Sequence, residues 1–101
     1  MTVANDTTAP KVSITAPASG ATVRKTITIS ATATDNVGVV GVQFKLDGAN
    51  LGAEVITAPY AISWTTTTAP SEIHTLTAVA RDAAGNTSIS SAVTVTVKNP
   101  R

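Results

Sequence analysis

The chain has 101 residues, of which 43% are hydrophobic and only 13% charged, so it can bury the core of one domain and is too short for two. Seven Lys and Arg residues against six Asp and Glu residues leave a net charge of +1, without the clustered basic surplus that nucleic-acid binding requires. The lack of Cys and the single His exclude disulfides, thiol chemistry and zinc fingers, and no apolar run approaches the roughly 20 residues that cross a membrane.

Alternating apolar and polar residues predict β-strands along most of the chain. Thr is the commonest residue and Val is frequent, which favours strands because both are β-branched. A first strand is predicted over residues 12–15. The clearest alternation covers residues 26–34, where Ile and Ala occupy one face and Thr and Ser the other. A third strand over residues 40–46 ends at a tight hairpin turn formed by Asp47 and Gly48.

The second half of the chain continues this pattern. Residues 51–56 are predicted as a weaker edge strand, followed by a strand over residues 60–65 and a loop. A strand over residues 73–81 leads into a turn at residues 82–86, and residues 93–97 form the last strand. No segment has a helical period, so the chain is predicted to be all-β.

About seven strands, each with one apolar face, predict two sheets that bury those faces against each other. The aromatic residues fall in the inward phase, where small alanines can oppose them, so we expect them in the core; they are Phe44, Tyr60 and Trp64. Residues 10–98 form the predicted domain, while residues 1–9 and 99–101 are predicted linkers, with Pro10 and Pro100 limiting backbone freedom at the entry and the exit.

Five stretches in register resemble a bacterial immunoglobulin-like domain of secreted and cell-surface proteins. They are residues 12–20 (VSITAPASG), 33–39 (ATDNVGV), 44–48 (FKLDG), 58–64 (APYAISW) and 74–86 (HTLTAVARDAAGN). The resemblance spans residues 10–97 and implies an immunoglobulin-like antiparallel β-sandwich, here without a disulfide. It also implies a non-catalytic module of a larger secreted or surface protein, because relatives act as spacers, stalks or docking modules. They occur singly or as tandem copies beside catalytic, carbohydrate-binding or adhesive domains, and some adhesin members bind calcium.

No pattern in the sequence indicates a catalytic site. His74 is the only His and lies in phase with the inward residues Leu76 and Ala78, which favours a structural role. No Ser-His-Asp order and no glycine-flanked serine accompanies it. A sandwich of this size offers no deep cleft for a pair of carboxylates. We therefore expect no enzyme activity and no cofactor other than calcium.

Oxygen-bearing side chains occur in segments that an immunoglobulin-type sandwich brings to one end. Hard oxygen ligands suit Ca²⁺, so these residues are a candidate calcium cluster. The alternative is that Asp and Asn bind the backbone N–H groups of their own turns. The cluster consists of Asp6, Asp35, Asn36, Asp82 and Asn86.

Two functions of different classes remain open. The first is a structural module that spaces, orients or displays the neighbouring domains of the same polypeptide. The second is a ligand-binding module for polysaccharide or another cell-surface partner, for which exposed aromatic rings would be the sign. The outward Thr residues resemble the flat surface of ice-binding proteins, but strand propensity and a solvated hydroxyl explain them more simply. We expect a monomer with no nucleic-acid partner and no membrane insertion.

Overall fold

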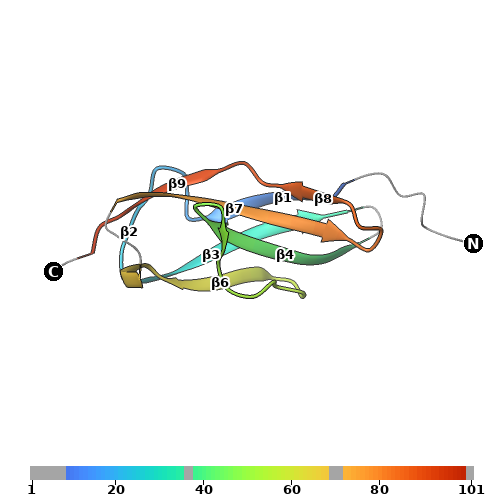
Figure 1. Cartoon of the computed structure of the whole chain (residues 1–101), viewed down its shortest axis with the longest axis horizontal. Helices are drawn as coiled ribbons and strands as arrows, with labels where there is room; N and C mark the ends of the chain where they lie inside the picture. Colours follow the sequence, from blue (N-terminus) through green and yellow to red (C-terminus); the bar gives the residue numbers. More distant parts are fainter. Residues whose placement is uncertain (1–8, 36–37, 69–71, 100–101) are drawn as a thin grey trace, which may run out of the picture.

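The computed structural model describes residues 9–35, 38–68 and 72–99, which fold into two β-sheets packed face to face (Figure 1). Within these residues there are nine strands and one short 3-10 turn, η1. Their bounds are β1 (Lys11–Ala16), β2 (Thr22–Val23), β3 (Thr26–Thr34), β4 (Val39–Leu46), β5 (Ala49–Asn50), β6 (Tyr60–Thr65), η1 (Thr66–Thr68), β7 (Ile73–Asp82), β8 (Thr87–Ile89) and β9 (Val93–Val97).

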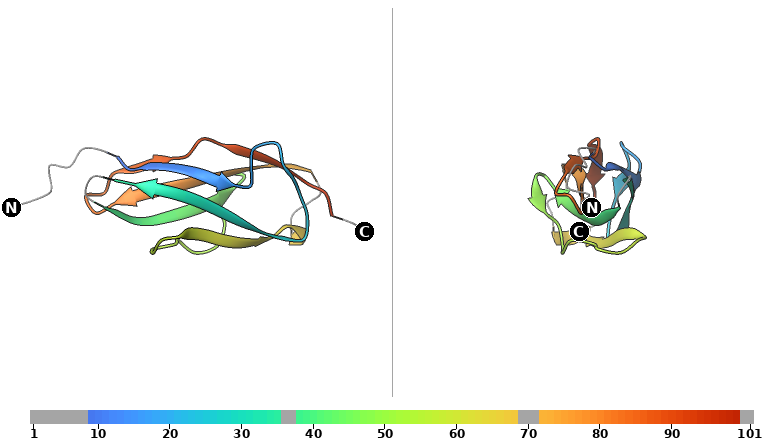
Figure 2. Two further views of the ribbon diagram at one scale, coloured as in Figure 1. Left: turned by 180° about the vertical axis from the view of Figure 1, so that it is seen from behind. Right: turned by 90° about the vertical axis from the view of Figure 1, so that its right-hand side faces the viewer.

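The smaller sheet has the order β1-β3-β6, and the larger sheet has the order β2-β9-β7-β4-β5, with β8 paired to β7. This arrangement confirms the predicted all-β, immunoglobulin-like sandwich of two sheets. One strand pair departs from the antiparallel arrangement, because β2 pairs with β9 in parallel. The chain leaves the smaller sheet after β1 and joins the larger sheet as β2 without reversing its direction (Figures 1 and 2). Because β9 runs in the same direction, the two strands pair in parallel.

The predicted edge strand over residues 51–56 is also corrected. The return strand is instead β5, which begins directly after the turn and pairs Ala49 with Leu46. Asp47 and Gly48 have φ values of 51° and 86°, which give the backbone twist that a two-residue hairpin requires and confirm the predicted tight turn. The predicted segment forms no continuous strand: Val55 makes an isolated bridge to Val42, and the backbone N–H of Leu51 donates a hydrogen bond to the carbonyl oxygen of Phe44 at 2.9 Å.

The core lies between the two sheets and follows the predicted alternation. Phe44 and Trp64 are buried as expected, whereas Tyr60 is half-buried at the beginning of β6. Small residues of β3 and β7 face these rings, so large and small side chains interdigitate. The buried apolar residues are Val23, Ile29, Ala31, Val42, Phe44, Trp64, Leu76, Ala78, Ala80, Val93, Val95 and Val97.

The chain enters the described domain at one end of the sandwich and leaves it at the other (Figure 1). At the first end, the Ser88 hydroxyl donates a hydrogen bond to the carbonyl oxygen of Pro10. At the opposite end, the Asn99 amide oxygen accepts a hydrogen bond from the backbone N–H of Lys25 at 2.7 Å. The first and last described segments are therefore both fixed to the sandwich by side-chain hydrogen bonds. Among the described residues, no helix has the length and hydrophobicity to cross a membrane.

Candidate functional site

His74 lies in β7 with its side chain 3% exposed, in the inward phase that the alternation predicts. Its Nδ1 lies 2.5 Å from the Oδ2 of Asp47, and the other Asp47 oxygen accepts a hydrogen bond from the backbone N–H of Thr75 at 2.9 Å. The imidazole also meets the Trp64 indole edge to face, with the ring centroids 6.2 Å apart and the planes at 84°. The side chain of Asp47 thus closes the β4–β5 hairpin onto β7.

The hydrogen bond from His74 and then the one from Thr75 hold the pKa of Asp47 below its ordinary value. A carboxylate beside an imidazole is also the pair that general acid–base catalysis uses. Here the imidazole is buried and packs edge to face on Trp64, so the pair joins the hairpin to the core. Sequence reasoning placed Asp47 only in the hairpin and missed this pair, because the contact depends on the register between β4 and β7.

The predicted calcium cluster is described only in part, since Asp6 and Asn36 lie outside the described residues. The structure brings the other three to one end of the sandwich, where β3 and β7 end and β1 begins (Figure 1). The side chain of Asp35 accepts a hydrogen bond from the backbone N–H of Gly38 at 3.1 Å. Asp35, Asp82 and Asn86 thus lie at the same end of the sandwich, and their convergence around an ion stays a prediction.

The carboxylate of Asp82 is 2% exposed and serves its own turn. Its Oδ1 accepts hydrogen bonds from the backbone N–H groups of Ala84 at 3.0 Å and Asn86 at 2.8 Å. Its Oδ2 accepts a third from the Asn86 side-chain amide at 3.1 Å. Residues 9–35, 38–68 and 72–99 contain no group of three or more His, Cys, Asp or Glu residues placed to hold a metal. Turn formation accounts for Asp82, and the calcium cluster stays a prediction.

One ion pair spans the outer face of the larger sheet. The Arg81 guanidinium donates two hydrogen bonds to the Glu54 carboxylate, from Nε at 2.6 Å and from a terminal nitrogen at 2.9 Å. This pairing lowers the pKa of Glu54 and raises that of Arg81. Glu54 reaches Arg81 across Gly41, the cross-strand partner of Arg81, and a Cβ at residue 41 would overlap the Glu54 carboxyl group.

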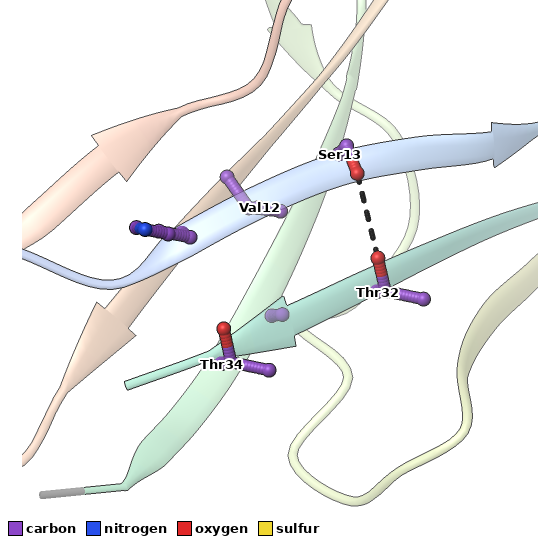
Figure 3. A pocket seen from close by; sticks show the side chains of 6 residues that line it. Val12, Ser13, Thr32 and Thr34 are labelled. Atoms are coloured by element: carbon purple, nitrogen blue, oxygen red, sulfur yellow. Dashed lines mark hydrogen bonds between the residues drawn. The ribbon is translucent and has the colours of Figure 1, made fainter. Parts of the chain in front are cut away.

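The smaller sheet carries hydroxyl groups on its outer face, beside a hollow of about 260 Å³ along β1 and β3. Ser13 and Thr32 are cross-strand partners whose hydroxyl oxygens lie 3.4 Å apart (Figure 3). Among the described residues, no aromatic ring lines the hollow to offer a stacking surface, and no carboxylate or imidazole accompanies its Lys and hydroxyl groups. Its lining residues are Lys11, Val12, Ser13, Thr32, Ala33 and Thr34.

Comparison with protein-family models supplies the identity that this geometry leaves open. The model of the bacterial Ig domain matches residues 10–78, which is most of the sandwich. The chain belongs to the bacterial Ig domain family. A comparison of this Ig domain with curated proteins finds no match.

Solved structures resemble this Ig domain over nearly its whole length. The fibronectin(III)-like modules of CbhA from Clostridium thermocellum match with a TM-score of 0.73 and 30% identity, covering 90% of this chain and 100% of that one. The endo-β-1,4-mannanase from Thermotoga petrophila matches with a TM-score of 0.76 over 97% of this chain. At 18% identity and 22% of the mannanase chain, that second match shows the fold alone. Ig-like and fibronectin-like modules of this kind are typically non-catalytic.

Proposed function

We propose that this Ig domain is a non-catalytic structural module that spaces and orients neighbouring domains in a larger secreted or surface bacterial protein. One observation carries the proposal. The described chain enters the sandwich at one end and leaves it at the opposite end, and a side-chain hydrogen bond fixes the backbone at each of these two points. A domain attached in this way holds its two neighbours apart by the length of its strands.

The packing between the sheets supports this function because it makes the separation rigid. Trp64 and Phe44 fill the space between the layers, and long-range strand pairing joins the first and last strands to the rest. A packed sandwich resists bending in a way that a flexible linker of equal length does not. The likeness to modules of CbhA, at 30% identity, supports a place within a multidomain extracellular protein.

Two observations weigh against the other functions considered. The imidazole of His74 is buried, and among the described residues no carboxylate or imidazole lies beside the hydroxyl groups of the hollow to activate them. The burial of Phe44 and Trp64 leaves Tyr60, half-buried, as the one ring that could stack on a neutral sugar. A spacer needs neither catalytic groups nor exposed aromatic rings.

The spacer function is tested by placing the full chain between two fluorescent reporter domains and measuring the distribution of energy transfer between them. The comparison is a Gly/Ser linker with the same number of residues. We expect a low and narrow transfer distribution for the Ig domain, and a broader one for the linker and for a Trp64→Ala variant that has lost its core. A distribution as broad as that of the linker would refute the spacer proposal.

A further inference from the structure

Three basic residues lie close along the backbone at the end of the sandwich where the described chain leaves it. In the parallel ladder of β2 and β9, Val23 pairs with Val97, so the next residues along each strand, Arg24 and Lys98, lie side by side. The backbone N–H of Lys98 donates to the carbonyl oxygen of Val23 at 3.0 Å, which extends the register past the ladder. Lys25 follows Arg24 in the turn to β3. Arg24, Lys25 and Lys98 together form the basic cluster.

The basic cluster has no internal counter-ion in the part of the chain that the structure describes. Its three side chains are exposed and none of them forms an ion pair there, whereas Arg81 is held by Glu54. Glu72 is near in the fold, since its carbonyl oxygen accepts a hydrogen bond from Val97, but its carboxylate forms no ion pair among these residues. Like charges placed side by side repel, so an external anion would stabilise this end of the domain.

The backbone beneath the cluster is held firmly. Lys25 has a φ of 58°, a left-handed conformation that Gly or Asn adopts more readily than Lys. Its carbonyl oxygen accepts hydrogen bonds from the backbone N–H and the hydroxyl of Thr66, at 2.8 and 2.7 Å, and its N–H binds Asn99. Thr66 is fully buried and also accepts a hydrogen bond from the Asn99 amide at 3.1 Å. The turn that carries Lys25 is therefore fixed by hydrogen bonds from both sides of the sandwich end.

We propose that the basic cluster binds an anionic polymer that carries carboxylate or phosphate groups, such as an acidic glycan. A polymer fits better than a small anion because the three charges lie along an exposed strand end rather than in an enclosed site. The attraction is electrostatic, so it weakens as salt is added.

The test titrates the full, isotopically labelled chain with polygalacturonate, with long-chain polyphosphate and with neutral dextran, and follows backbone amide shifts by NMR. We expect shifts at the basic cluster with one or both charged polymers and none with dextran. Arg24→Glu with Lys98→Glu should weaken binding about tenfold or more. The matched control is Lys11→Glu with Lys45→Glu, which changes the net charge equally at other sites and should weaken binding far less.

Lys25→Asn separates binding from folding. Asn accepts the left-handed backbone, so this variant should keep the melting temperature of the wild type or exceed it while weakening polymer binding. Response to polygalacturonate alone identifies a carboxylate polymer as the ligand, and response to polyphosphate alone identifies a phosphate polymer; both support the proposal. Three results would overturn the proposal. They are equal weakening of polymer binding by the two double variants, equal binding of dextran, and charge-dependent self-association without polymer binding.

Discussion

The Nδ1 of His74 and the Oδ2 of Asp47 lie 2.5 Å apart, joining a core side chain that is 3% exposed to a hairpin side chain that is 49% exposed. This contact ties the β4–β5 turn to β7, and the backbone N–H of Asp47 adds a 2.8 Å hydrogen bond to the carbonyl oxygen of Thr75. It also fixes the imidazole against the ring of Trp64. The lone His is thus explained as a link between the hairpin and the core.

Asp47→Asn should destabilise the domain by about 1 kcal/mol at neutral pH, since it weakens a charge-assisted hydrogen bond in a half-exposed setting. The hydrogen bonds from His74 and Thr75 lower the pKa of Asp47 in the folded state. The stabilisation is therefore fully present above the ordinary carboxyl pKa of 3.8 and is lost as the pH falls through the lowered value. Urea unfolding at a series of pH values measures this, with Glu72→Gln as the control. A difference between Asp47→Asn and wild type that persists at the lowest pH would contradict the assignment.

Trp64→Ala should cost about 3–5 kcal/mol, a large share of the roughly 5–15 kcal/mol that stabilises a domain of this size. The indole Nε1 of Trp64 is buried without a hydrogen-bond acceptor among the described residues. Trp64→Phe removes this unsatisfied donor and keeps an aromatic ring, so it should cost much less than Trp64→Ala. Thermal and urea unfolding of both variants give the comparison. A soluble Trp64→Ala protein with unchanged stability would count against a core built around this ring.

Alternation of apolar and polar residues was enough to predict the six longer strands, because each buries one face and solvates the other. β2 and β8 escaped prediction because two or three residues cannot display a period. The parallel pairing of β2 arises from a change of sheet after β1, which depends on tertiary packing and leaves no local pattern. The pairs His74–Asp47 and Arg81–Glu54 were hidden for a similar reason, since each joins residues 27 positions apart through strand register.

Removal of calcium should leave the melting temperature of the isolated chain unchanged. The physical reason is that the turn itself satisfies both oxygens of Asp82, through Ala84 and Asn86. Melting curves with added Ca²⁺ and with EDTA decide the question. Asp82→Ala is the companion variant, and it should lose about 1–3 kcal/mol equally in both conditions, because it removes turn hydrogen bonds rather than a metal ligand. A midpoint that falls in EDTA would instead support the predicted cluster.

Gly41→Ala should disrupt the Arg81–Glu54 ion pair, even though the backbone at residue 41 is not left-handed and a strand ordinarily favours Ala over Gly. The reason is steric: the added methyl group overlaps the Glu54 carboxyl group where it crosses to Arg81. The displaced atoms are the far end of a flexible side chain, so Gly41→Ala should cost no more than the surface ion pair that Glu54→Ala removes, about 0–1 kcal/mol. In the double variant the obstacle is gone, so the combined loss should be smaller than the sum by up to about 1 kcal/mol. Urea unfolding of the four proteins measures this coupling; additive losses would mean that Glu54 does not lie over Gly41 in solution.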